Sequence, residues 1–146
     1  MKVEHTLVIN QPVAKVFAAL TDFENEPRWQ TGLLESRHTP AGPVGIGTKV
    51  TQIRKFFGRP VETIGEVVEY EMNQKMVSRS TPENPPPSFK TVYRVEPIDD
   101  HTRLFYSIEL KGQGFFKLIQ PFIKRSITKD VITRFNTLKS LLEANG

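Results

Sequence analysis

Apolar and polar residues alternate in short segments over most of the chain, which is the pattern of β-strands with one buried face. The segments are rich in Val, Ile, Thr, Tyr and Phe, and turn-forming stretches such as PAGPVGIG, TPENPPP and PIDDH separate them. Because no helical pattern lies between the later segments, neighbouring strands are expected to pair as antiparallel hairpins. Seven strands are predicted, at residues 2–9, 33–38, 48–57, 61–70, 75–81, 88–96 and 102–111.

Helical periodicity appears in two places that flank these strands. After the first strand, Pro12 suits the first turn of one short helix, and a second is predicted over residues 22–31. After Gly114 the period is helical again as far as Asn145. Pro121 leaves two possibilities for this long helix, because either it begins there or it is kinked about one turn in.

This order of elements predicts an α+β fold in which a curved antiparallel sheet wraps around the long C-terminal helix. It fits neither a helix bundle nor a doubly wound sheet. A strongly twisted sheet would curl around the helix and leave a cavity lined by alternate strand residues and by one helix stripe. No repeat or linker interrupts the chain, so residues 1–146 are expected to form a single domain. The predicted cavity-lining residues are His5, Phe89, Thr91, Tyr93, Leu104, Tyr106, Ile108, Ile127, Val131 and Arg134.

Composition narrows the classes of protein. The 146 residues include 20 Lys plus Arg and 16 Asp plus Glu, a formal net charge of +4, without any run of five consecutive basic residues. This mild charge argues against a nucleic-acid partner. The chain has no cysteine, which excludes disulfide scaffolds and thiolate sites, and no apolar stretch reaches the ~20 residues of a membrane span. A soluble, cytoplasmic protein without stable membrane insertion is therefore expected.

No catalytic motif stands out. The glycine-rich stretch at residues 42–48 lacks the spacing of a dinucleotide or Walker loop, and no serine lies in a nucleophile elbow. The three histidines are too scattered for a metal motif, so neither a metal nor a cofactor is expected. Glu24 and Glu26 fall at a helix start, where carboxylates are usually solvated. Paired acid catalysis by them is not expected, and no catalytic residue is assigned.

Two polar residues of the predicted cavity have two interpretations each. Arg134 falls inside the apolar stripe of the long helix. In the first interpretation it pairs with Asp130 or extends its guanidinium to the cavity rim, and in the second it offers a buried cation to the acid group of a ligand. His5 lies on the apolar side of the first strand, where it either finds a backbone partner or faces the cavity. Trp29, in the second short helix, is interpreted as a packing residue.

The inward face of the strand at residues 48–57 stays undecided. If the face that carries Val50 is the concave one, then Gln52 or Arg54 points inward. Ile53 and Phe57 favour the opposite face, so the alternation gives no decision.

Six stretches of the chain together resemble a known superfamily. They are INQPVAKVFAALTDFENEPRW, GPVGIGTKV, GEVVEYE, YRVEP, TRLFYSIEL and ITRFNTLKSLLE. The chain is similar to the START and birch-pollen-allergen (SRPBCC) superfamily of helix-grip proteins, and within it to the bacterial branch called polyketide cyclase/dehydrase and lipid transport. The resemblance covers nearly the whole chain. It implies a helix-grip fold that binds lipids, sterols, aromatic polyketides or similar molecules, without a shared catalytic motif.

The function expected from these observations is the binding or carriage of a hydrophobic or amphipathic small molecule, lipid-like or aromatic polyketide-like, by a monomer or homodimer. The first alternative is an enzyme, a cyclase or dehydratase of an aromatic polyketide, with Tyr93, Tyr106 or His5 as acid or base. The second alternative is a protein-interaction module that uses the sheet exterior or the helix, as in chaperone-activating relatives of the superfamily. The residues favour binding over catalysis.

Overall fold

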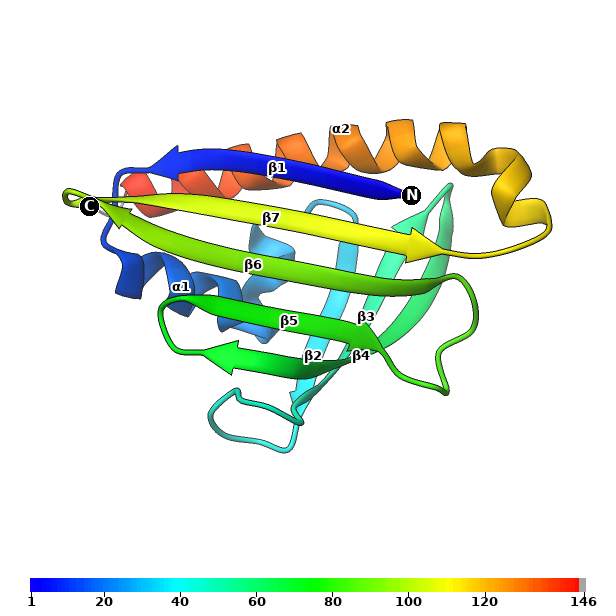
Figure 1. Ribbon diagram of the computed structural model, residues 1–146, viewed down its shortest axis with the longest axis horizontal. Helices are drawn as coiled ribbons and strands as arrows, with labels where there is room; N and C mark the ends of the chain where they lie inside the picture. The colour runs from blue at the N-terminus through cyan, green and yellow to red at the C-terminus, as the bar shows by residue number, and fades with distance from the viewer. Residues whose placement is uncertain (145–146) are drawn as a thin grey trace.

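The computed structural model describes residues 1–144 and has the strands and helices that the sequence predicts (Figure 1). The end of the predicted long helix at Asn145 lies outside the described residues. In chain order the elements are β1 (Lys2–Ile9), α1 (Val13–Thr21), η1 (Phe23–Arg28), β2 (Leu33–Thr39), β3 (Lys49–Phe56), β4 (Arg59–Glu71), β5 (Lys75–Ser80), β6 (Ser88–Ile98), β7 (His101–Lys111) and α2 (Phe115–Ala144).

All seven strands form one antiparallel sheet in the order β1-β7-β6-β5-β4-β3-β2. From β2 onward each strand pairs with the next along the chain, as short connections require. Strand β1 forms the other edge of the sheet and pairs with β7, so that His5 lies opposite Tyr106. The sheet curves, and α2 runs beside β1 along its length (Figure 1). The architecture is the predicted α+β helix grip.

The core lies between the inner face of the sheet and α2. Successive strand residues point to opposite faces, so every second residue of β6 and β7 enters the core. Tyr93, Leu104 and Tyr106 are buried in this way, and α2 contributes Val131 and Phe135. Phe135 is fully buried and lies at the centre of this core.

Helix α2 begins before Pro121, which lies inside it. Proline has no amide hydrogen and its ring crowds the preceding turn, so it bends a helix. Figure 1 shows the start of α2 turned away from the axis of the remaining helix. Of the two possibilities left by the sequence, the kink is correct.

A buried polar cluster as the candidate functional site

An aromatic cluster fills the centre of the interior. The ring of Phe135 lies 4.9 Å from that of Tyr106, 5.6 Å from Trp29, 6.0 Å from His5 and 6.3 Å from Tyr93, measured between ring centroids. Trp29 therefore packs in the core, as expected. His5 stacks on Phe135 with its ring only 23° out of parallel, so its side chain faces the interior.

The predicted cavity-lining residues lie on the inner face of the sheet or on the matching stripe of α2, at different depths. Two of them, Phe89 and Thr91, are half-buried. The Phe89 ring packs over Gly65 of β4, so closely that a Cβ atom at Gly65 would lie 3.3 Å from a ring carbon. Ile108 and Ile127 pack at the margin of the core. The buried members are Tyr93, Leu104, Tyr106, Val131 and Arg134.

Glu26 is buried, contrary to the expectation that this carboxylate is solvated. Its exposed fraction is 3%. A 3₁₀ helix has three residues per turn, so Phe23, Glu26 and the capping residue Trp29 share one face, and all three are buried. The signal in the sequence that Glu26 points inward was the pair of apolar residues three positions before and after it, Phe23 and Trp29.

Glu26 is held by two side chains, one from the segment that follows η1 and one from β3. Its Oε2 accepts a hydrogen bond of 3.0 Å from Gln30 Nε2 and one of 2.8 Å from Gln52 Nε2. Arg54 Nη2 donates to Gln52 Oε1 at 3.4 Å. These bonds show which face of β3 points into the core. Gln52 and Arg54 lie on this inner face together with the buried Val50.

Arg134 pairs with Asp130, as its first interpretation predicts. The Arg134 Nη2 atom donates to Asp130 Oδ2, one turn earlier on α2. Burial by itself lowers the pKa of Arg134, but the nearby Tyr106 and Asp130 outweigh it and leave the pKa above its ordinary value. Arg134 is therefore a cation in the core, with an exposed fraction of 8%.

The same surroundings shift the protonation of the other groups. Burial raises the pKa of Glu26 from 4.5 to about 7, although the hydrogen bond from Gln52 and the charges of Arg54 and Arg134 oppose this. Burial also raises the pKa of both Tyr93 and Tyr106, so their hydroxyl groups stay protonated at neutral pH. The cluster thus combines two cations, two protonated phenols and a carboxyl group that titrates near neutrality.

Four buried polar atoms around this cluster have no hydrogen-bond partner among the described residues. They are His5 Nε2, Gln30 Oε1, Arg54 Nη1 and Arg134 Nε. Buried polar atoms in native proteins are nearly always paired with protein or ordered water. These atoms can therefore accept or donate to a ligand or to water that enters the interior.

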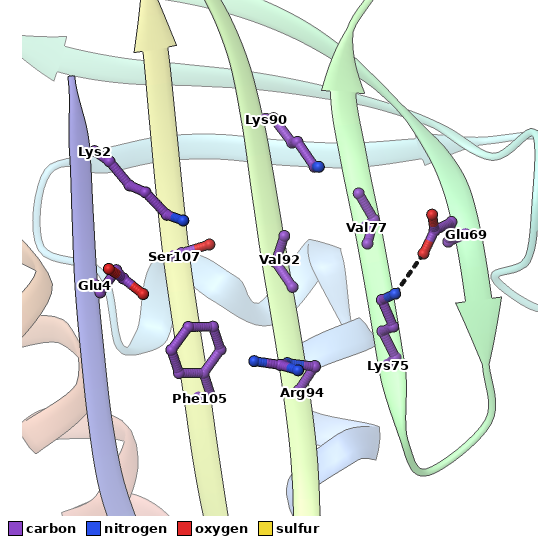
Figure 2. A pocket seen from close by; sticks show the side chains of 10 residues that line it. All are labelled: Lys2, Glu4, Glu69, Lys75, Val77, Lys90, Val92, Arg94, Phe105 and Ser107. Atoms are coloured by element: carbon purple, nitrogen blue, oxygen red, sulfur yellow. Dashed lines mark ion pairs between the residues drawn. The ribbon is translucent and has the colours of Figure 1, made fainter.

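Two surface hollows of the described residues lie over the sheet. The larger, of about 290 Å³, is on the outer face of β1, β4, β5, β6 and β7 (Figure 2). There the Arg94 guanidinium lies 4.6 Å over the Phe105 ring, and Lys75 Nζ pairs with Glu69 Oε2 at 2.7 Å. The second hollow, of about 190 Å³, continues past Lys90 toward the start of β6. Neither hollow contains the buried cluster, which lies on the opposite face.

Within residues 1–144 the structure has no helix long and apolar enough to cross a membrane. Over the same residues no three His, Cys, Asp or Glu side chains come together in a group that could hold a metal ion.

Comparison with known proteins adds to this description. Residues 1–143 match the model of the family described as polyketide cyclase / dehydrase and lipid transport. No curated protein sequence matches the chain.

Several solved structures share the fold. The structure of TTHA0849 from Thermus thermophilus superimposes with a TM-score of 0.84 at 15% identity, covering 100% of this chain and 99% of that one. A START superfamily protein from Mycobacterium smegmatis gives 0.78 at 15% identity, with 99% of each chain covered. The Zhui aromatase/cyclase from Streptomyces sp. R1128 gives 0.81 at 13% identity, covering 98% of this chain and 93% of that one.

Proposed function

The chain belongs to the polyketide cyclase / dehydrase and lipid transport family, and from this premise we propose that it binds an amphipathic small molecule, lipid-like or aromatic polyketide-like, between the sheet and α2. The observation that carries the proposal is the group of unpartnered polar atoms beside the aromatic interior. A packed core without a ligand role would leave few such atoms in one place. The polar end of an amphipathic ligand would form hydrogen bonds with these atoms, and its apolar body would pack against the aromatic interior.

The polar end of the ligand would lie at Arg54 and Arg134. Each guanidinium has a buried nitrogen without a hydrogen-bond partner, and a planar guanidinium suits a carboxylate or another oxygen-rich group. The apolar body would lie against the rings of Tyr93 and Tyr106. Each square ångström of apolar surface removed from water contributes roughly 25 cal/mol.

Phe135 decides how much room the ligand has. Its ring contacts both tyrosines and occupies the centre of the interior. The ligand would therefore enter by displacing this ring or by a shift of α2. The predicted lining residues, including His5, Phe89, Thr91 and Ile108, would then form the walls.

Native mass spectrometry of freshly purified protein tests the proposal directly. A bound small molecule, released on denaturation and identified, is the expected result. Calorimetry with a long-chain fatty acid and its methyl ester then tests the polar end. Arg134→Leu should weaken binding of the acid by at least about tenfold more than binding of the ester, because the ester has no charge for the guanidinium to stabilise.

A matched control is Arg103→Leu, since Arg103 also pairs with a carboxylate, Glu96, at 2.8 Å, but on the outer face of the sheet. It should leave both affinities unchanged. Equal losses for acid and ester in Arg134→Leu would contradict the assigned head-group role. Absence of binding by every fatty acid and aromatic polyketide analogue would contradict the proposed function.

One observation favours a second candidate, a cyclase or dehydratase. A general acid or base works best with a pKa near the working pH, and burial raises the pKa of Glu26 to about 7. Tyr93 and Tyr106 would act as hydrogen-bond donors, since their raised pKa values make them poor bases. Turnover of a polyketide analogue that is lost in Glu26→Gln, with binding retained, would establish the enzyme.

The proposed partner is thus a small molecule that a monomer or homodimer would carry in the cytoplasm. Gel filtration with light scattering gives the oligomeric state, and cell fractionation gives the compartment.

A further inference from the structure

The first two turns of α2 expose three large apolar side chains on one side. Phe115, Leu118 and Phe122 have exposed fractions of 72%, 75% and 71%. At 3.6 residues per turn they point within about 60° of one another. Figure 1 shows that this part of the helix extends beyond the ends of β1 and β7. These three residues form what is called here the α2 apolar patch.

Single exposed apolar residues are normal on protein surfaces, whereas a contiguous group marks an interaction site. Elsewhere in the described chain, exposed apolar side chains such as Leu34, Ile46 and Met72 come from three separate segments. The α2 apolar patch differs because its members stand on successive turns of one helix. This arrangement is typical of a surface that binds a partner.

The charge around the patch is strongly positive. Lys117, Lys124, Arg125 and Lys129 of α2 are all exposed, and residues 110–129 contain no Asp or Glu. Helix α2 has six basic and two acidic residues, a net charge of +4. Since the whole chain also has a net charge of +4, the remaining residues balance to zero. All of the excess positive charge belongs to this helix.

We propose that the α2 apolar patch docks onto a lipid bilayer surface that contains anionic lipids. Phenylalanine and leucine side chains on one helix face can enter the boundary between head groups and acyl chains, while lysine and arginine remain at the head groups. The charge argues against a second copy of this chain as the occupant, because it would bring the same positive helix to the patch. Docking of this kind is peripheral, and no part of α2 crosses the bilayer.

This docking does not rest on the proposed ligand binding. It uses the outside of the first turns of α2, whereas the ligand would contact residues on the buried side of the helix and the sheet. Experiments with vesicles that hold no added ligand therefore test the docking separately, and failure of one proposal leaves the other standing.

The test is co-sedimentation of the protein with phosphatidylcholine vesicles, either pure or with about 30% phosphatidylserine, at roughly 0.1 M salt. Binding to the phosphatidylserine vesicles should be at least roughly tenfold tighter than to the neutral ones. The triple variant Phe115→Ser, Leu118→Ser, Phe122→Ser should lose roughly tenfold or more in affinity for the anionic vesicles. Lys117→Glu with Lys124→Glu should remove the preference for phosphatidylserine.

The matched control removes three apolar side chains that are also exposed: Leu34→Ser, Ile46→Ser, Met72→Ser. It should bind the anionic vesicles like the unchanged protein. Circular dichroism spectra and melting temperatures show that each variant folds. The proposal is overturned if the unchanged protein does not sediment with anionic vesicles, or if both triple variants bind equally. A dimer in sedimentation equilibrium that the α2 variant abolishes, without vesicle binding, would instead identify a second copy as the occupant.

Discussion

Gln52 on β3 donates its side-chain Nε2 to the Oε2 atom of Glu26 on η1 at a distance of 2.8 Å. The contact joins a short helix near the start of the chain to the middle of the sheet and holds a carboxyl group inside the core. Because the carboxyl group is buried, its protonation is coupled both to folding and to whatever enters the interior.

Replacing Gln52 by Leu should raise the pKa of Glu26 further above about 7, since the hydrogen bond from Gln52 favours the charged form. The free energy of unfolding should fall by about 1–3 kcal/mol at a pH where Glu26 is charged, because the carboxylate loses a donor. NMR titration of the labelled Glu26 carboxyl carbon and urea unfolding give the two values. An unchanged pKa would show that the hydrogen bond does not form in solution.

Glu26→Gln should change how stability depends on pH. The folded chain keeps a proton on Glu26 between its unfolded pKa of 4.5 and its folded pKa of about 7, whereas the unfolded chain releases it. Stability from this group is thus fully present below pH 4.5 and is lost as pH rises to about 7. The loss is on the order of 3 kcal/mol.

Urea unfolding at a series of pH values measures this effect. Between pH 4.5 and 7 the unchanged protein should lose stability relative to Glu26→Gln, so the difference between their unfolding free energies should move in favour of the variant. Above pH 7 this difference should stay constant. Glu35→Gln is the control at an exposed carboxylate, which pairs with Arg37, a group that stays charged at every pH of the series. It should not reproduce this dependence, and a constant difference for Glu26→Gln would contradict the raised pKa.

Phe135→Ala should open the interior. Removing a fully buried phenylalanine costs about 3–5 kcal/mol in the free energy of unfolding, because the cavity keeps part of its volume. The space should bind hydrophobic probes such as fluorescent fatty acids more tightly, as measured by fluorescence titration. Ile132→Ala, on the exposed side of the same helix, should change stability by less than about 0.5 kcal/mol. Weaker probe binding in a folded Phe135→Ala protein would place the ligand elsewhere.

Arg134→Met should leave stability unchanged within about 1 kcal/mol or raise it. The free energy needed to remove the Arg134 guanidinium from water is about as large as the free energy gained from its ion pair with Asp130. Without Arg134, the Asp130 carboxylate is exposed enough to be hydrated. Thermal unfolding at pH 7 measures the change. A loss of more than about 3 kcal/mol would show that the arginine is retained for stability, which would weaken its assignment to ligand binding.

The sequence was sufficient to predict the fold because its elements follow clear periodicities. Alternation located the strands to within a few residues, and the helical period placed Arg134 inside the buried stripe of α2. Both results follow from side-chain direction, which depends only on the local backbone geometry.

The site was predicted only in part. The burial of Glu26 was not predicted, because its segment forms a 3₁₀ helix. In a 3₁₀ helix every third residue lies on the same face, whereas the prediction used the α-helical spacing of three and four residues. The orientation of Gln52 and Arg54 stayed open because apolar residues occur on both faces of β3. The packing of Phe135 at the centre depends on the curvature of the sheet and its distance from α2, which no local pattern contains.

The pairing of β1 with β7 has a consequence for how the protein is made. Val8 O accepts from Lys139 Nζ at 2.7 Å, and Asn10 N donates to Glu143 Oε2 at 2.8 Å, so residues at the end of β1 meet partners that lie 131 and 133 positions later in the chain. Until β7 and α2 have been synthesised, β1 lacks these neighbours and the aromatic interior has no cover. The sheet and its core are thus completed only after α2 has been synthesised, and the partly synthesised chain is the form that most needs a chaperone.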